Sequence, residues 1–161
     1  MEKKLDISVI SPVFNELENL ETFVESVTAV MNSTNMSWEL IIVDDGSNDG
    51  SSKILKKIGH QENIRSILLS KNYGQTTAIQ AGFDNAVGEY FVTLDSDLQN
   101  DPKDIPMLIQ KLINEELDLV VGWRKDRKDN YFFRNLPSIL ANKLIGTITG
   151  VKLHDYGCSL K

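Results

Sequence analysis

Cysteine is almost absent from this chain of 161 residues. The single cysteine, Cys158, excludes an internal disulfide and is typical of a protein from a reducing compartment. The two histidines, His60 and His154, stand at no metal-ligand spacing from each other or from Cys158, which argues against a zinc site. No apolar run approaches the roughly 20 residues of a membrane helix, and residues 1–4 do not resemble a signal peptide. We therefore expect a soluble, cytoplasmic chain.

The composition that remains is that of an ordinary globular protein. Hydrophobic residues make up 41% of the chain and charged residues 25%, both close to the average for soluble domains. A chain of this length can bury roughly two-thirds of the surface that it exposes when unfolded. We therefore expect residues 1–161 to form a single domain.

Charge is divided unevenly along the sequence. Residues 1–120 hold 9 Lys or Arg and 20 Asp or Glu, whereas residues 121–161 hold 8 and 3, and the net charge is −6. Such an acidic chain is not expected to bind nucleic acid. The basic last part suits phosphate groups or an anionic membrane surface, although a solvated helix face would look the same.

Strands and helices alternate along the sequence. The spacing of apolar residues predicts strands over Leu5–Ser11, Trp38–Val43, Ile64–Leu69, Tyr90–Leu94 and Leu117–Gly122. It predicts helices over Leu20–Met31, Ser51–Ile58, Thr76–Val87 and Asp104–Asn114, with a long amphipathic helix within Tyr131–Thr149. Repeated strand–helix units indicate an α/β fold with a mostly parallel sheet and helices on both faces.

Polar residues follow each of these predicted strands. In open parallel sheets, ligands bind at the carboxyl ends of the strands. The residues at these ends are Pro12, Phe14, Asn15 and Glu16, then Asp44 and Asp45, then Lys71, Asn72 and Gly74, then Asp95, Asp97 and Gln99, and finally Gly122 and Arg124. Packing alone would not choose one edge of the sheet, so the pattern predicts a functional site there.

The most informative of these groups is the pair Asp95 and Asp97, directly after an apolar strand. In an extended backbone, residues two apart point to the same side. Two such carboxylates repel each other unless a cation lies between them, and oxygen ligands suit Mg²⁺ or Mn²⁺. The motif therefore suggests a metal-bridged nucleotide diphosphate, although Asp-x-Asp alone would also suit a solvated turn.

Five motifs in order resemble a known enzyme family. They are Pro12–Glu16 (PVFNE), Val43–Asp49 (VDDGSND), Lys71–Gly74 (KNYG), Leu94–Pro102 (LDSDLQNDP) and Gly122–Arg124 (GWR). The chain resembles the family-2 inverting glycosyltransferases of GT-A fold, and within them the polyprenyl-phosphate glycosyltransferases. That subfamily includes dolichyl-phosphate mannose synthase and the bacterial undecaprenyl-phosphate sugar transferases. The segment His154–Lys161 resembles its Asp-x-Gly-Cys segment, in the version found in aminoarabinose-type transferases. The resemblance covers nearly the whole chain.

The resemblance implies a role for each motif. The nucleotide-sugar site would consist of Pro12, Phe14, Glu16, Asp44, Asp45, Lys71, Asn72, Gly74, Asp95, Ser96 and Arg124. The Mg²⁺ or Mn²⁺ ligands would be Asp95, Asp97 and Gln99, and the catalytic residues Asp155 and Arg124, with Arg127 or Arg134 as further candidates for the phosphates. Whether Asp44 or Asp45 contacts the base is open. Lys71 stands where relatives often carry Arg and lacks the planar fork of that side chain.

The implied reaction is a direct displacement at the anomeric carbon by a polyprenyl-phosphate oxygen, with inversion. The donor would be a nucleotide diphosphate sugar, with UDP favoured over GDP by resemblance alone. Asp155 would act as a base or orient the acceptor. Two other functions stay open, transfer to a saccharide acceptor and non-catalytic binding of nucleotide sugar. Since relatives continue past the position of Lys161, we also expect a truncated domain, which in the full protein would lie at the cytoplasmic face of a membrane.

Overall fold

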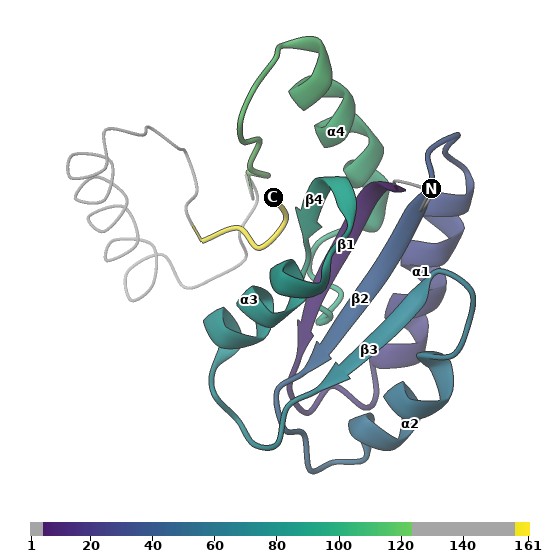
Figure 1. Cartoon of the computed structure of the whole chain (residues 1–161), viewed down its shortest axis with the longest axis vertical. Helices are drawn as coiled ribbons and strands as arrows, with labels where there is room; N and C mark the ends of the chain where they lie inside the picture. The colour runs from purple at the N-terminus through teal and green to yellow at the C-terminus, as the bar shows by residue number, and fades with distance from the viewer. Residues whose placement is uncertain (1–4, 124–156) are drawn as a thin grey trace, which may run out of the picture.

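A four-stranded parallel sheet forms the centre of the computed structural model, which describes residues 5–123 and 157–161 (Figure 1). Its order is β3-β2-β1-β4. The strands are β1 (Leu5–Val13), β2 (Trp38–Asp44), β3 (Ile64–Leu68) and β4 (Gly88–Thr93). The first four predicted strands are therefore confirmed to within two residues at each end. The central strands are buried, β1 from Ile7 to Val13 and β2 over its whole length, because both of their faces are covered.

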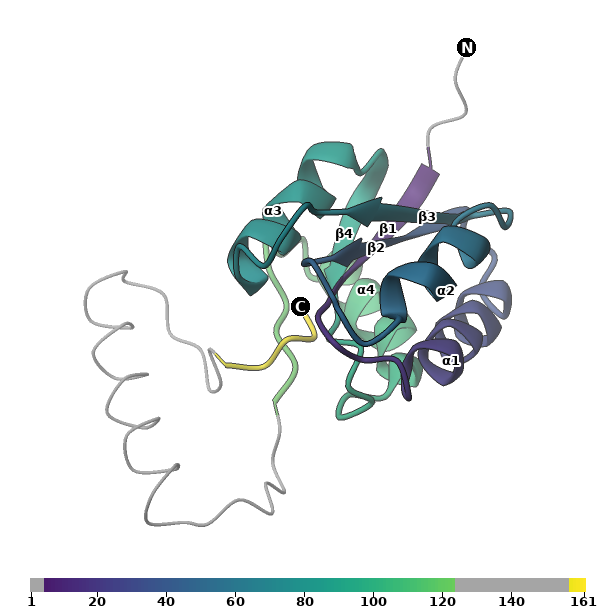
Figure 2. The same ribbon diagram turned by 90° about the horizontal axis from the view of Figure 1, so that it is seen from below.

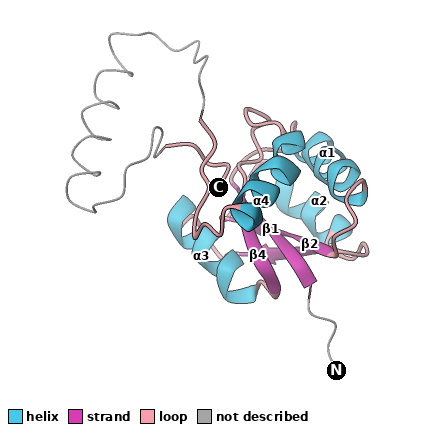
Figure 3. Cartoon of the chain, turned by 90° about the horizontal axis from the view of Figure 1, so that it is seen from above, coloured by secondary structure: helices cyan, strands magenta, loops and turns pink. Residues whose placement is uncertain are grey.

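Helices cover both faces of this sheet, as the sequence predicts. The helices are α1 (Leu20–Asn32), α2 (Ser51–Ile58), α3 (Gln75–Asn85) and α4 (Ile105–Asn114), and the 3₁₀ turn η1 (Pro102–Asp104) precedes α4. Figures 2 and 3 show α3 on one side of the strands and α1, α2 and α4 on the other. The smaller apolar cluster, under α3, contains Ile41, Val43 and Ala78. The larger one, on the opposite face, includes Leu40 and Ile42 from the same strand.

The prediction of a strand over Leu117–Gly122 is wrong. The segment is irregular, and the place beside β4 is taken by the last residues of the described chain. Thr93 and Lys161 exchange both backbone N–H···O bonds, at 2.9 and 3.2 Å, as in an antiparallel pair. The Gly122 N–H reaches only the Leu160 carbonyl, at 2.9 Å. The apolar pattern at 117–122 therefore reflects burial of Val120, not strand pairing.

The helix predicted within Tyr131–Thr149 lies outside the described residues. Within residues 5–123 and 157–161, no helix is long and apolar enough to cross a membrane.

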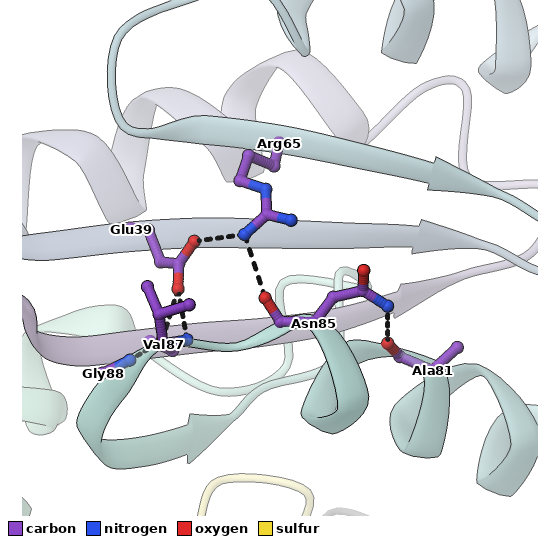
Figure 4. A network of polar contacts seen from close by, with 7 residues as sticks. Glu39, Arg65, Ala81, Asn85, Val87 and Gly88 are labelled. Carbon is purple, nitrogen blue, oxygen red and sulfur yellow. Dashed lines mark hydrogen bonds and ion pairs between the residues drawn. The ribbon is translucent and has the colours of Figure 1, made fainter. Parts of the chain in front are cut away.

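A buried carboxylate joins the amino ends of three strands (Figure 4). Glu39, in β2, accepts hydrogen bonds from the Ser8 hydroxyl at 2.7 Å and from the Val87 N–H at 2.9 Å. Its second oxygen lies 3.1 Å from Nη1 of Arg65, which also donates to the Asn85 carbonyl at the end of α3. The network therefore fixes the end of α3 and the start of β4 against the sheet, at the edge opposite the predicted site.

Replacing this carboxylate should destabilise the fold strongly. Glu39→Ala leaves the Val87 N–H and the Ser8 hydroxyl without their acceptor. Each buried group left unpaired costs about 1–3 kcal/mol, so we expect a loss of about 2–5 kcal/mol in the free energy of unfolding measured in urea. Glu115→Ala is the matched control, because it also removes a glutamate that is paired with a basic side chain, but this ion pair with Lys111 is exposed. Its loss should cost less than about 1 kcal/mol. Equal losses in the two variants would contradict this role of Glu39.

Candidate functional site

The carboxyl ends of β1, β2, β3 and β4 surround one cleft of about 300 Å³. The parallel strands, whose arrowheads in Figure 1 mark their carboxyl ends, bring residues far apart in the sequence to this edge. The described residues that line it are Pro12, Val13, Phe14, Glu16, Asp45, Asn72, Gly74, Gln75, Asp95, Ser96 and Asp97. Nine of these eleven are residues that the sequence singled out for a nucleotide-sugar and metal site.

Five predicted site residues do not appear among these cleft residues. Asp44, Lys71 and Gln99 are described but lie outside the lining set. Arg124 and Asp155 lie outside the described residues, as do Arg127 and Arg134. The sequence reasoning missed Val13 and Gln75, which line the cleft. Val13 carries no chemical signal in the sequence, whereas Gln75 directly follows a motif that was recognised.

The two adjacent aspartates after β2 have different positions. One oxygen of Asp44 accepts the Ser47 N–H at 3.0 Å and the other accepts the Ser52 hydroxyl, so this buried side chain shapes the loop before α2. Asp45 points the other way, as neighbours in an extended chain do. Its oxygens accept the backbone N–H groups of Tyr73 and Gly74, at 2.7 and 2.8 Å, and it lines the cleft. Of the two aspartates, Asp45 is therefore the one that lies at the cleft.

The loops after β2 and β3 are packed directly against each other. Gly46 has a φ of +74°, and a Cβ placed there would lie 2.4 Å from the carbonyl carbon of Lys71. Only glycine adopts this conformation at so close an approach without strain. The Lys71 side chain is exposed, and its ammonium lies 5.2 Å from the centre of the Tyr73 ring.

The loop after β1 is held by the loop after β2. Asn15, with a φ of +58°, donates its N–H to the Ser47 hydroxyl at 2.9 Å. Its side-chain oxygen accepts the Asn48 N–H, also at 2.9 Å. These bonds hold the turn that presents the half-exposed Phe14 ring and the Glu16 carboxylate to the cleft. An aromatic face beside hydrogen-bond acceptors suits a nucleobase and its ribose.

All three residues of the Asp95–Asp97 segment line the cleft. Ser96 is buried, and its hydroxyl lies 3.3 Å from the Pro12 carbonyl. Asp97 accepts the Gln99 N–H at 3.1 Å, and Asp95 accepts an N–H of the Gln75 amide at 2.7 Å. Among the described residues, no three His, Cys, Asp or Glu side chains gather as a metal site. The Asp95–Asp97 segment therefore offers two carboxylates to the cleft.

The end of the described chain contacts the loop that follows these aspartates. The Asn100 amide donates to the Ser159 hydroxyl at 2.8 Å, and the Cys158 thiol lies 3.6 Å from its oxygen. The Thr93 hydroxyl donates to the Ser159 carbonyl at 2.7 Å. Residues 157–161, which follow directly on the predicted acceptor residue Asp155, are thus fixed to the loop that carries the paired carboxylates.

Sequence comparison then decides the family. The model of a family described as glycosyl transferase family 2 matches residues 8–160. The chain belongs to that family. It is 53% identical over 161 residues to a dodecaprenyl-phosphate galacturonate synthase of Rhizobium johnstonii. The aligned region covers 99% of this chain and 48% of that relative. It is 42% identical over 157 residues to an undecaprenyl-phosphate 4-deoxy-4-formamido-L-arabinose transferase of Salmonella paratyphi A, covering 96% of this chain and 47% of the relative. The chain thus spans about half the length of these relatives.

Two solved structures share the fold of this chain. TarS of S. aureus, residues 1–349, aligns with a TM-score of 0.56 at 20% identity, over 81% of this chain and 40% of that one. A mannosyltransferase of Pyrobaculum calidifontis, solved with GDP-mannose and Mn²⁺, aligns with a TM-score of 0.55 at 19% identity, over 75% and 35% of the two chains. These neighbours confirm the predicted GT-A fold.

One carboxylate at the rim of the site should make stability depend on pH. Burial acts to raise the pKa of Asp49, but hydrogen bonds from the N–H and hydroxyl of Ser51 and from the Leu17 N–H outweigh it, and the pKa lies below its usual value. A lowered pKa stabilises the fold above about pH 4 and loses this effect as the pH falls further.

Asp49→Ala removes the acceptor of the Ser51 N–H, the Ser51 hydroxyl and the Leu17 N–H. It should therefore lower the free energy of unfolding at pH 7 by about 0.5–1.5 kcal/mol, the typical net contribution of a hydrogen bond. The difference from the unchanged chain should shrink as urea unfolding is repeated from pH 5 down to about pH 2.5. The exposed Asp118 is the control, and Asp118→Ala should change stability little at any pH. A deficit in Asp49→Ala that is constant with pH would show that the charge is not responsible.

Proposed function

We propose that this chain is the nucleotide-sugar-binding part of a glycosyltransferase that transfers a sugar, with inversion, to a polyprenyl phosphate. The observation that carries the proposal is the cleft, in which Asp95 and Asp97 lie together with Phe14 and Asp45 at one edge of the sheet. A pair of carboxylates and an aromatic ring that line one cleft suit the two parts of a nucleotide diphosphate. The names of the relatives, a galacturonate synthase and a formamido-arabinose transferase acting on polyprenyl phosphates, support the acceptor class.

The donor set of the cleft fits a divalent cation. Asp95 and Asp97 are hard oxygen ligands, and Mg²⁺ or Mn²⁺ bound by one or two carboxylates completes its shell with water and substrate phosphates. A mannosyltransferase of the same fold was solved with Mn²⁺. When bound, the ion would stabilise the negative charge that develops on the departing nucleotide diphosphate. Gln99 is a weaker candidate as a ligand, because its side chain is exposed and outside the cleft.

The chain's own residues would bind and orient the donor. Phe14 offers an aromatic face, and Asp45 and Glu16 offer acceptors to base and ribose N–H and O–H groups. Both oxygens of Asp45 already accept backbone hydrogen bonds, so it is held rigid before the donor arrives. A polyprenyl phosphate is anionic near pH 7 and needs less help from a base than a sugar hydroxyl, so catalysis would rest mainly on positioning.

The remaining parts of the proposal rest on the resemblance. UDP is favoured over GDP as the donor nucleotide, Arg124 would contact its diphosphate or the acceptor phosphate, and Asp155 would lie near the acceptor. The acceptor's lipid chain would place the full protein at the cytoplasmic face of a membrane.

Metal-dependent nucleotide binding is the first test. Calorimetry should show that Mn²⁺ strengthens the binding of UDP or GDP, because Asp95 and Asp97 would hold the ion and its positive charge would attract the diphosphate. Asp97→Asn should remove this enhancement, whereas Asp104→Asn, an exposed aspartate in the turn that follows, should keep it. A free nucleotide concentration of about 100 times its dissociation constant should also stabilise the fold by about 2.7 kcal/mol, which thermal unfolding can measure. Metal-dependent binding that survives in Asp97→Asn would contradict the assignment of the metal ligands.

The acceptor class is decided by a transfer assay with radiolabelled UDP-sugars. The chain and a version extended to the length of its relatives are compared on undecaprenyl phosphate and on oligosaccharides. The proposal predicts sugar on the lipid phosphate with the longer version, and nucleotide binding with little or no transfer by residues 1–161. Transfer to an oligosaccharide alone would favour the saccharide-acceptor function, and nucleotide-sugar binding without transfer by either version would favour a binding module.

A further inference from the structure

A glutamine across the cleft contacts one of the paired carboxylates. Gln75, the first residue of α3, lines the same cleft as Asp95 and donates a side-chain N–H to its Oδ1 at 2.7 Å. The direction of this bond follows from chemistry, because an ionised carboxylate can only accept. Gln75 follows β3 and Asp95 follows β4, and these are the outer strands of the sheet order β3-β2-β1-β4. The bond therefore spans the cleft.

Both ends of this bond are fixed by other contacts. Asp45 accepts the N–H groups of Tyr73 and Gly74, which sets the place where α3 begins. On the other side, the buried Ser96 hydroxyl lies 3.3 Å from the Pro12 carbonyl and sets the backbone beside Asp95. With both backbones held in this way, the amide selects one orientation of the carboxylate.

We infer that Gln75 is a positioning residue of the proposed metal site, holding the Asp95 carboxylate in the orientation in which it binds a divalent cation. This inference rests on the proposed metal-dependent binding of a nucleotide diphosphate. Carboxylates that bind metals are usually hydrogen-bonded by a second residue, and loss of that residue typically lowers metal affinity about 10- to 100-fold. The amide contacts Oδ1 of Asp95, within the cleft that Asp95 shares with Asp97.

The same helix provides a matched control. Gln80 donates to Asp84 at 2.8 Å, which is also a bond from an exposed glutamine amide to a carboxylate, but neither residue lines the cleft. Gln75→Met and Gln80→Met each remove such an N–H donor and keep an unbranched side chain of similar length that suits a helix. Both variants should therefore unfold within a few degrees of the unchanged chain.

The experiment is a calorimetric titration of Mn²⁺ into each variant at saturating UDP. Gln75→Met should weaken Mn²⁺ binding about 10- to 100-fold, and Gln80→Met should leave it unchanged. Gln75→His, whose ring N–H can lie at a similar distance from the backbone, should recover part of the affinity.

The possible failures are distinct. If the unchanged chain shows Mn²⁺-dependent UDP binding and Gln75→Met binds Mn²⁺ equally well or more tightly, the role of Gln75 is overturned and the proposed function stands. Tighter binding would mean that the amide competes with the cation for the carboxylate. If the unchanged chain shows no metal-dependent binding of UDP or GDP, this inference and the proposed metal site are overturned together.

Discussion

The parallel pairing of β1 with both of its neighbours is the constraint on which the site depends. Val13 lies opposite Asp44 in β2, and Ile10 lies opposite Thr93 in β4. Since Asp44 in turn lies opposite Leu68, β1, β2 and β3 end at one level, whereas β4 ends three residues before the end of β1. The residues that follow the four strands meet at one cleft. Since side chains alternate along a strand, a shift of either register by one residue would turn a whole row of side chains to the other face. On one face of β1, Ile7, Val9 and Val13 pack in the larger apolar cluster, and on the other Ile10 packs against Gly82 of α3, and these contacts oppose such a shift.

The two ends of this sheet have separate roles. At the amino ends of the strands, Glu39 has its hydrogen bonds to Ser8, Val87 and Arg65 and lies away from any cleft residue. At the carboxyl ends, the carboxylates of Asp45 and Asp95 also accept hydrogen bonds, but they line open space of ligand size. The Glu39 network stabilises the sheet at the amino ends of its strands. This stability offsets the repulsion between the carboxylates that line the cleft at the carboxyl ends.

The sequence predicts the sheet, its helices and the edge that carries the site, because each of these depends on local periodicity and on strand direction. It fails where the outcome depends on contacts between distant residues. Leu117–Gly122 has the apolar pattern of a strand, yet residues 157–161 pair with β4 in its place. Asp44 and Asp45 look equivalent in the sequence, and only the folded loop separates their directions. Gln75 resembles any exposed helical glutamine until Asp95, 20 residues on, is placed beside it.

The central place of β1 also has a consequence for how the chain folds. The first strand pairs with β2 and with β4. The hydrogen-bond partner of Ser8, Gly88, is therefore synthesised 80 residues later. Closing a loop of that length lowers the entropy of the chain before the stabilising contacts between the strands form. Sheets built from such distant pairs therefore fold slowly. In a chain emerging from the ribosome at about 5–20 residues per second, the apolar residues of β1 remain without their second neighbour for several seconds. This interval is when the strand is most exposed to aggregation, and when a chaperone has the most to protect.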